Sequence, residues 1–258
     1  MTFILGHNLD RLDSVRFVIA IPSYKEIIAL PILIEKLSSH MNPYDAVMIL
    51  DDSPTDTNIK LQSLTTGAFR GSKGILLFLN SDKKLGRGAA VRRGMLSCQK
   101  YFPNLEYFIE CDADGSHQVS DIIKLKDYPS KVDLVIGSRY LPTSQIIGWS
   151  VQRKIFSRLL NFAIPILLRV SVKDITNGLR RYSPEAIEYI LKVKPLNSGF
   201  TYLSEQIVIV HTKGLSILEL PIIFIDRVSG KSTVTYKEIF NSIKGVLQLL
   251  LHRKSLNA

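Results

Sequence analysis

Two aspartates separated by one small residue are the part of the sequence best suited to chemistry. Asp112 and Asp114 follow the apolar run LEYFIEC, with Ala113 between them. If the chain stays extended there, both side chains point to the same side, about 6.5 Å apart at Cα, and can share a divalent cation. Mg²⁺ or Mn²⁺ held by two carboxylates completes its shell with water and phosphate oxygens, which suits a diphosphate leaving group. The alternative is a turn in which Asp114 or Ser116 caps the next helix.

A second acidic pair, Asp51 and Asp52, ends an earlier apolar run. Carboxylates at such a position can accept hydrogen bonds from a ribose hydroxyl or from an N–H group of a nucleobase. The Ser53-Pro54 pair that follows also favours a plain turn. The loop is therefore predicted either to contact a nucleoside or to serve only as a turn, and its sequence is compatible with both.

Two basic segments lie beside glycines. Arg227 and the nearby Gly230-Lys231-Ser232 form a polar loop after an apolar run, and this loop is predicted to close over a diphosphate. A solvated surface loop is the alternative. The segment Gly86-Arg87-Gly88 opens a predicted helix whose N-terminus can receive an anion, although paired glycines are equally typical of a tight turn.

Residues 151–168 form a very apolar segment with a basic stripe. Its apolar residues recur at helical spacing, and Arg153, Ser157 and Asn161 recur every four residues. A core helix with one solvated face would show this pattern, and so would a helix lying at a membrane surface. A second basic amphipathic helix is predicted near the C-terminus. Its apolar positions are Ile239, Ile243, Val246, Leu247 and Leu250.

Positioning these residues requires a sheet whose strands end near one another. Apolar or β-branched runs alternate with amphipathic segments, which predicts a βαβαβαβαβ order and an α/β fold with a mostly parallel sheet flanked by helices. Ligands of such sheets bind beyond the carboxyl ends of the strands, where the acidic pairs lie. The predicted strands are 15–21, 46–50, 74–79, 105–110, 132–136 and 178–182; the predicted helices include 28–37, 89–99, 184–191 and 203–213, with an extended run at 215–225.

Composition limits the classes of protein that remain. The 258 residues include 33 Lys+Arg and 23 Asp+Glu, for a net charge of +10, and 46% are hydrophobic, which fits one folded domain and excludes disordered and fibrous chains. The charge indicates a polyanionic partner: a nucleic acid, an anionic membrane or a phosphorylated substrate. Because the basic clusters adjoin glycines and acidic motifs, nucleic acid is disfavoured. The isolated histidines show no zinc-ligand spacing, and two cysteines make no disulfide framework.

Taken together, these motifs resemble the dolichyl-phosphate mannose synthase group of polyprenol-phosphate glycosyltransferases, a GT-A group within glycosyltransferase family 2. The resemblance extends from Val18 to about Leu251, and its order and spacing are more specific than any single motif. The matching pieces are IPSYKE at 21–26, DDSPTDT at 51–57, KKLGRGAAVRRG at 83–94, DADGSH at 112–117, GSRY at 137–140, GWSVQRKIFSR at 148–158, DITNGLRRY at 174–182, SGFTYLSEQ at 198–206 and DRVSGKS at 226–232.

The resemblance implies a role for each group of site residues. The donor nucleotide sugar would be bound by Pro22, Tyr24, Glu26, Asp51, Asp52, Ala113, Arg227 and Lys231. Asp112 and Asp114 would bind Mg²⁺ or Mn²⁺ and, with Arg227, form the catalytic set. The acceptor phosphate would be bound by Arg139, Arg153 and Ser157. This chain departs from the family pattern at Lys25, Gly115 and Thr233, where the family usually has Asn, Leu and Lys.

The implied activity is inverting transfer of a hexose onto dolichyl or polyprenyl monophosphate, with GDP-mannose as the favoured donor. The acceptor is largely a dianion at neutral pH and needs no general base. Residues 1–236 would form the catalytic domain and 237–258 an amphipathic helix beside it. The N-terminus lacks the pattern of an export signal, so we expect a peripheral protein on the cytoplasmic membrane face, with an anchoring subunit left open.

Two other functions stay open on the sequence. A GT-A transferase acting on a sugar hydroxyl would need a carboxylate base, and Glu205 is the best candidate for that role. A basic membrane-surface adaptor without turnover would use the same positive charge for binding alone.

Overall fold

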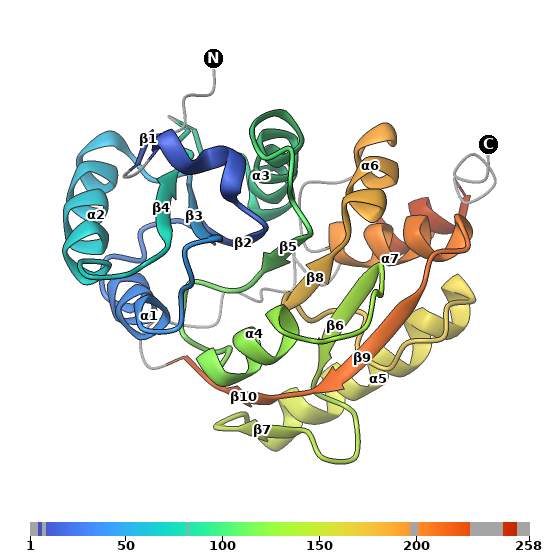
Figure 1. Ribbon diagram of the computed structural model, residues 1–258. Helices are drawn as coiled ribbons and strands as arrows, with labels where there is room; N and C mark the ends of the chain where they lie inside the picture. The colour runs from blue at the N-terminus through green and yellow to red at the C-terminus, as the bar shows by residue number, and fades with distance from the viewer. Residues whose placement is uncertain (1–4, 7–8, 82, 197–200, 228–244, 252–258) are drawn as a thin grey trace.

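The computed structural model describes residues 5–6, 9–81, 83–196, 201–227 and 245–251. Its centre is an eight-stranded sheet with helices on both faces (Figure 1), as predicted. The strand order is β1-β4-β3-β2-β5-β8-β6-β9. The strands are β1 (Leu5–Gly6), β2 (Phe17–Ser23), β3 (Asp45–Asp51), β4 (Ile75–Phe78), β5 (Tyr107–Glu110), β6 (Leu134–Ser138), β8 (Arg180–Tyr182) and β9 (Ile217–Pro221), and a separate pair joins β7 (Gln145–Ile147) to β10 (Ile223–Ile225).

Most of the sheet is parallel because helices connect its strands. The pairs β4·β3, β3·β2, β2·β5 and β6·β9 are parallel, whereas β8 lies antiparallel between β5 and β6. Strands covered on both faces need apolar side chains on both sides, which explains why β3 and β4 are buried along their whole length. The helices are α1 (Ala29–Ser38), α2 (Thr55–Ala68), α3 (Arg87–Tyr101), α4 (Val119–Lys126), α5 (Val151–Leu168), α6 (Pro184–Lys192) and α7 (Tyr202–Thr212), after a 3₁₀ turn η1 (Leu9–Ser14).

The two faces of the sheet have separate apolar cores. Helices α1, α2 and α4 cover one face, and their apolar side chains pack with those of Ile19, Ile49 and Ile109. Helices α3, α6 and α7 cover the other face, where Val246 and Leu249 of a final helical stretch also pack. No described helix has the length and hydropathy that crossing a bilayer requires.

Local sequence signals explain the ends of two helices near the site. The Ser150 side chain caps α5 by accepting a hydrogen bond from the Arg153 amide, and Ser183 caps α6 by accepting one from the Ala186 amide. The run predicted as extended at 215–225 divides at Ile222 into β9 and β10, which belong to different sheets. The strand predicted at 178–182 is the short β8, and its antiparallel direction was not anticipated.

Candidate active site

The candidate site lies beyond the carboxyl ends of β2 and β5, at the point where the chain order of the sheet changes direction. Strand β2 pairs with β3 on one side and with β5 on the other, so the loops after all three strands meet there. They enclose a cavity of about 270 Å³. Its lining includes Pro22, Ser23, Tyr24, Glu26, Asp52, Lys84, Gly86, Arg87, Asp112, Ala113, Asp114 and Arg227.

Asp112 and Asp114 both line this cavity, but the backbone that carries them is a turn. Strand β5 ends at Glu110, and Gly115 has a φ of +76°, so the extended geometry expected from the sequence is wrong. The Asp114 Oδ1 atom accepts a hydrogen bond from the Ser116 amide at 3.0 Å, which confirms the alternative prediction of a turn. Neither Asp114 nor Ser116 caps the next helix, whose N-cap residue is Gln118. The turn nevertheless leaves both carboxylates at the cavity, so the structural and the functional readings describe the same loop.

Each of the two carboxylates is paired with an arginine from elsewhere in the chain. Arg87, the first residue of α3, forms an ion pair with Asp112. The Arg227 Nε atom lies 3.6 Å from Asp114 Oδ2. Burial alone would raise the pKa of Asp114, but hydrogen bonds from Ser116 and the charge of Arg227 lower it below its usual value. Asp114 is therefore a carboxylate at neutral pH.

His117 holds the backbone of Asp112 in place. Its Nδ1 atom accepts a hydrogen bond from the Asp112 amide at 3.0 Å, so Nε2 carries the proton and donates to Asn177 Oδ1 at 3.0 Å. Burial lowers the pKa of His117 to about 4, so the ring is neutral. The sequence favoured a structural or surface role for this histidine, and the structure makes it a fully buried support of the aspartate turn.

Arg87 is fixed by a buried network that the sequence did not reveal. Its guanidinium donates to Glu110 Oε1 from Nε at 3.0 Å and from Nη2 at 2.9 Å, and to the Tyr202 hydroxyl at 2.7 Å. The Tyr182 hydroxyl lies 3.3 Å from Glu110 Oε2. These bonds leave Nη1 directed to Asp112, so the network aims one cationic group at the cavity.

The acidic pair after β3 divides its functions. Asp51 is buried, and its two oxygens accept hydrogen bonds from Ser53 and Asn58, each at 2.7 Å, so its side chain stabilises the loop. Asp52 lines the cavity, pairs with Arg93 and accepts a hydrogen bond from the Leu85 amide at 3.0 Å. Burial raises the pKa of Asp52 above its ordinary value. The structure therefore brings only Asp52 of the pair to the predicted nucleotide site.

The loop after β2 contributes Tyr24 and Glu26 to the same cavity. Burial, and next the charge of Asp114, raise the pKa of Glu26 above its ordinary value, which places the two carboxyl groups within electrostatic reach of each other. The Lys84 Nζ atom lies 4.2 Å from the centroid of the Tyr24 ring. The ring thus forms one wall of the cavity beside a cation.

Lys25 between them has a φ of +62°, in the left-handed region that asparagine tolerates better than lysine. We expect Lys25→Asn to raise the free energy of unfolding by about 0.5–1 kcal/mol, because the backbone is already in the conformation that the new residue accepts. Urea denaturation would measure the change, with Lys36→Asn on α1 as a control for loss of charge. A K25N protein less stable than the wild type would contradict this account.

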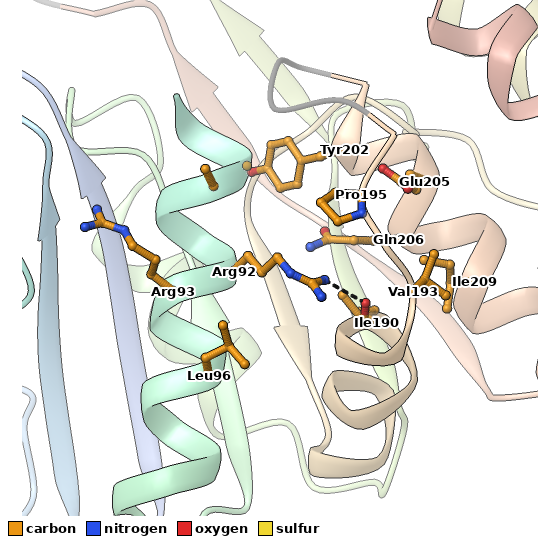
Figure 2. Close-up of a pocket in the computed structure, with 12 residues that line it drawn as sticks. Arg92, Arg93, Leu96, Ile190, Val193, Pro195, Tyr202, Glu205, Gln206 and Ile209 are labelled. Atoms are coloured by element: carbon orange, nitrogen blue, oxygen red, sulfur yellow. Dashed lines mark hydrogen bonds between the residues drawn. The ribbon is translucent and has the colours of Figure 1, made fainter. Parts of the chain in front are cut away.

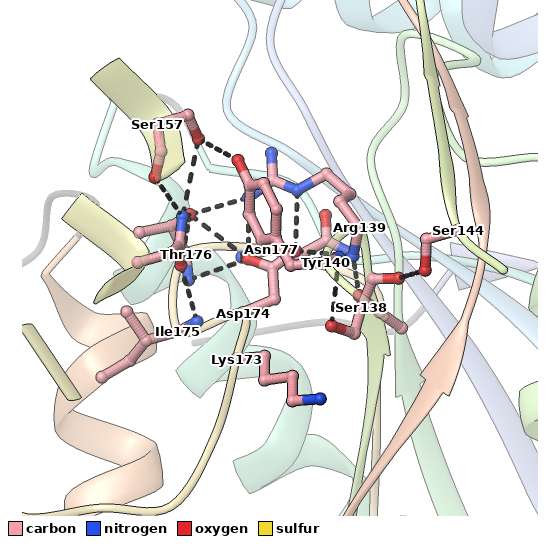
Figure 3. Close-up of polar contacts among 12 residues, drawn as sticks. Ser138, Arg139, Tyr140, Ser144, Ser157, Lys173, Asp174, Ile175, Thr176 and Asn177 are labelled. Atoms are coloured by element: carbon pink, nitrogen blue, oxygen red, sulfur yellow. Dashed lines mark hydrogen bonds and ion pairs between the residues drawn. The ribbon is translucent and has the colours of Figure 1, made fainter. Parts of the chain in front are cut away.

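The predicted acceptor residues Arg139 and Ser157 lie outside this cavity, in a polar cluster between β6, α5 and the loop before β8 (Figure 3). The Arg139 Nε and Nη2 atoms each donate to Asp174 at 2.8 Å, and Nη2 also donates to Thr176 at 2.7 Å. Ser157 accepts a hydrogen bond from the Tyr140 hydroxyl at 2.6 Å. In this structure Arg139 is therefore a buried structural arginine.

Arg153, the third predicted acceptor residue, is more accessible. Its Nη1 atom lies 3.0 and 3.1 Å from the two carboxylate oxygens of Asp226, and its guanidinium carbon lies 4.0 Å from the centroid of the Trp149 ring. Asp226 directly precedes Arg227 of the cavity. Arg139 of the cluster in Figure 3 also contacts Trp149, with its guanidinium carbon 5.3 Å from the ring centroid. Arg153 therefore lies between that cluster, which it approaches through Trp149, and the aspartate site, which it approaches through Asp226.

Glu205, the candidate base for a hydroxyl acceptor, lines a different cavity. This second cavity, of about 260 Å³, lies between α3, α6 and α7 (Figure 2). Glu205 Oε1 accepts a hydrogen bond from the Leu196 amide at 3.0 Å, and burial raises the pKa of Glu205. Neither Asp112 nor Asp114 lines this cavity, so the geometry does not place Glu205 beside the aspartates.

The residues of the aspartate cavity fit a Mg²⁺ or Mn²⁺ ion that shares its shell with a substrate. Asp112 and Asp114 both line the cavity and supply hard oxygen ligands, the donor type that these cations prefer. Among the described residues no group of three or more His, Cys, Asp or Glu side chains is arranged to hold a metal. Two carboxylates are too few for an all-protein cage, so the remaining ligands would be phosphate oxygens and water.

Some predictions lie outside the described residues, and some functional contacts were not predicted. Lys231, Ile239, Ile243 and most of the proposed 237–258 segment are not described. Glu110, Asp174 and Asp226 were not singled out as site residues, because each acts through an arginine that is distant in sequence. In the sequence, the only indication that these three residues matter is that they lie in the quoted motifs or next to them.

Comparison with known proteins agrees with these motifs. Residues 18–191 match the model of "Glycosyl transferase family 2". The chain is 29% identical over 227 residues to the "Polyprenol monophosphomannose synthase" of Mycolicibacterium smegmatis, an alignment that covers 87% of this chain and 83% of the relative. It is 28% identical over 220 residues to the "Undecaprenyl-phosphate mannosyltransferase" of Micrococcus luteus, with coverages of 85% and 88%.

Solved structures share the fold at low sequence identity. Glucosyl-3-phosphoglycerate synthase from Mycobacterium tuberculosis, crystallised with Mn²⁺, uridine-diphosphate and glucosyl-3-phosphoglycerate, superimposes with a TM-score of 0.61 at 16% identity, covering 96% of this chain and 85% of the other. The same enzyme crystallised with Mg²⁺ and uridine-diphosphate gives the same TM-score and identity, covering 96% and 84%. The predicted GT-A fold is confirmed.

Proposed function

The chain belongs to glycosyl transferase family 2 and is a glycosyltransferase, and on that premise we propose that it transfers mannose from GDP-mannose to a polyprenyl or dolichyl monophosphate. The names of the two relatives described above support the acceptor class and the sugar. The observation that carries the proposal is the convergence of Asp112, Asp114, Arg87 and Arg227 in one cavity. Two carboxylates and two guanidinium groups in one place suit a diphosphate and its cation.

The donor is proposed to bind with its nucleoside toward Tyr24 and Asp52 and its diphosphate toward the aspartate turn. Both residues line the cavity, where Tyr24 offers a ring for stacking and Asp52 offers carboxylate acceptors. A bound Mg²⁺ or Mn²⁺ would neutralise charge on the departing diphosphate. Arg227 approaches the same region from β10 and would donate to the phosphate oxygens as the bond to the sugar breaks.

The acceptor oxygen needs no general base in this reaction. A phosphate monoester has a second pKa near 6 and is largely a dianion at neutral pH, so an oxygen of the lipid headgroup can attack the sugar carbon directly. Attack opposite the leaving diphosphate inverts the configuration at that carbon. The role of the protein is then to position the headgroup, for which the accessible Arg153 is the best-placed cation. A sugar-hydroxyl acceptor is less well supported because Glu205 lines the other cavity.

The acceptor is a lipid, and helix α5 is the surface proposed to meet the membrane. It begins beside Trp149 and carries Arg153, so its N-terminal half adjoins the proposed headgroup site. Its outer face carries basic residues beside apolar side chains that are left exposed, which is typical of a helix that lies in a lipid interface. The exposed apolar residues are Val151, Ile155, Phe156, Leu159, Phe162, Ile166 and Leu167. The cytoplasmic face of that membrane is the proposed location of the reaction.

Phe162, with 70% of its surface exposed, tests this membrane surface. We expect Phe162→Glu to weaken binding to anionic phospholipid vesicles about 10-fold or more, since burying a phenylalanine stabilises by about 1.5–3 kcal/mol and tenfold in affinity corresponds to about 1.4 kcal/mol. Vesicle co-sedimentation would measure the affinity. Leu96→Glu, an equally drastic change at an exposed position of α3, is the matched control. Equal losses in both variants would contradict a specific role for α5.

One assay distinguishes the proposed function from its alternatives. The purified protein is incubated with each of several radiolabelled sugar nucleotides, with Mg²⁺ or Mn²⁺, and with saturated and unsaturated lipid phosphates. Labelled lipid formed from GDP-mannose supports the proposal. Transfer only to sugar hydroxyls, abolished in Glu205→Gln, would support the alternative acceptor. Salt-sensitive vesicle binding without any turnover would instead identify a membrane-surface adaptor.

A further inference from the structure

The Arg153–Asp226 ion pair differs from the neighbouring Arg139–Asp174 pair in how easily it can exchange partners. Its side chains are 30% and 32% exposed, whereas those of Arg139 and Asp174 are 7% and 0% exposed. A half-exposed pair contributes little to stability and separates at small cost. Separating a buried pair strands a charge in the interior at large cost. Of Arg139 and Arg153, it is therefore Arg153 that can release its carboxylate and take another anion.

Only part of the Arg153 guanidinium is occupied by Asp226. The contact uses the single nitrogen Nη1, and among the residues that the structure describes no other acceptor hydrogen-bonds this side chain. Its carbon lies over the Trp149 ring, which fixes the plane of the group. A planar guanidinium held in this way is suited to bind a phosphate through two nitrogens.

Asp226 is also attached to the donor cavity through its neighbour. Its Oδ1 atom accepts a hydrogen bond from the Arg227 amide at 3.1 Å, while the Arg227 side chain lies beside Asp114. The Asp226 amide donates to the Ile147 carbonyl at 2.9 Å, at the end of the β7·β10 pair. One carboxylate thus contacts both the proposed acceptor cation and the backbone of the donor-side arginine.

We propose that Asp226 is a positioning residue that serves as the internal counter-anion of Arg153, and that the acceptor phosphate takes its place. This inference rests on the proposed function. A phosphate monoester carries about −1.5 to −2 charges at neutral pH against −1 for a carboxylate, so it is the stronger partner for Arg153. Displacing Asp226 also removes the acceptor of the Arg227 amide. Binding of the acceptor thereby changes the hydrogen bonding of Arg227, the arginine that contacts Asp114.

The inference predicts that removing the Asp226 charge makes acceptor binding tighter. We expect Asp226→Asn to bind a detergent-soluble short-chain prenyl monophosphate about 3- to 10-fold more tightly than the wild type, measured by titration calorimetry on the full chain. Asp226→Glu, which restores the charge, should return the affinity toward the wild-type value. Glu188→Gln, which removes an exposed carboxylate paired with Lys192 on α6, is the matched control and should change nothing. Arg153→Ala should lose most of the binding.

A second readout tests the link to the donor cavity. In the wild type, saturation with the prenyl monophosphate should change the affinity for GDP at least 3-fold, and in D226N most of this coupling should disappear. Prenyl monophosphate affinity that is unchanged or weaker in a D226N protein that still binds GDP would overturn the inference alone. A wild type that binds GDP but no prenyl monophosphate would overturn the proposed acceptor and the inference together. Thermal unfolding of each variant confirms that it is folded.

Discussion

Replacing Asp114 by asparagine is expected to lower kcat/KM for sugar transfer about a thousandfold or more. The substitution removes a full negative charge from the proposed cation site, where electrostatic stabilisation of the leaving group contributes several kcal/mol. Asparagine retains the side-chain oxygen that accepts a hydrogen bond from the Ser116 amide, so the turn after β5 should persist. The loss therefore measures charge and not folding. Initial rates at varied GDP-mannose concentration, with Mg²⁺ or Mn²⁺, provide the comparison.

The control for this variant is Glu35→Gln, which removes an exposed carboxylate from α1. Helices α1 and α3 cover opposite faces of the sheet. The control variant should leave kcat/KM within a factor of two of the wild-type value. Urea unfolding of the two variants should give similar midpoints. A D114N protein with wild-type turnover would rule out a role for this carboxylate in binding a cation, and the catalytic cavity would have to be sought elsewhere.

The largest expected effect on stability follows from removing Asp174. Its carboxylate is fully buried and accepts hydrogen bonds from the Arg139 guanidinium at 2.8 Å and from three backbone amides, those of Arg139, Thr176 and Asn177. Asp174→Ala leaves the buried Arg139 charge unpaired, which costs about 3–5 kcal/mol of unfolding free energy. Urea denaturation measures this change. Glu188→Ala, which breaks an exposed pair, should cost less than about 1 kcal/mol.

The same carboxylate makes stability depend on pH in a defined direction. Burial alone would raise the pKa of Asp174, but the charge and hydrogen bonds of Arg139 lower it below its ordinary value. A group with a depressed folded pKa stabilises fully above its unfolded pKa of about 3.9, and this contribution is lost as the pH falls toward the folded value. Below pH 4 the wild type should therefore lose stability more steeply than D174A. Parallel pH dependence in the two proteins would contradict the pairing.

The sheet was the part of the fold that could be predicted most directly from the sequence. Strands β2 to β6 are covered by helices on both faces, so they are continuous apolar runs that a strand pattern identifies. The direction of β8 could not be predicted, because three residues carry no information on which neighbours they pair with. The division of 215–225 at Ile222 depends on packing against two different strands, which likewise lies beyond local sequence.

The part of the candidate site that could be predicted from the sequence is the set of residues that directly follow strands. Asp112, Asp114 and Asp52 reach the cavity because they follow β5 and β3, the two parallel strands that flank β2. The arginines that pair with Asp112 and Asp114 come from the start of α3 and from the segment after β10, and no periodicity in the sequence links them to the aspartates. The partner of Arg139 was equally hidden, because Asp174, with which it forms a buried ion pair, is distant in sequence.

Cys111 lies one residue before Asp112, yet its thiol is fully buried and does not line the cavity. Burial raises the pKa of Cys111 to about 12, so almost none of it is thiolate at neutral pH. Electrophiles and mild oxidants that enter the cavity therefore meet no reactive sulfur. Inhibitors of this enzyme would have to rely on reversible contacts with its carboxylates and guanidinium groups, and covalent warheads aimed at cysteine would find no target there.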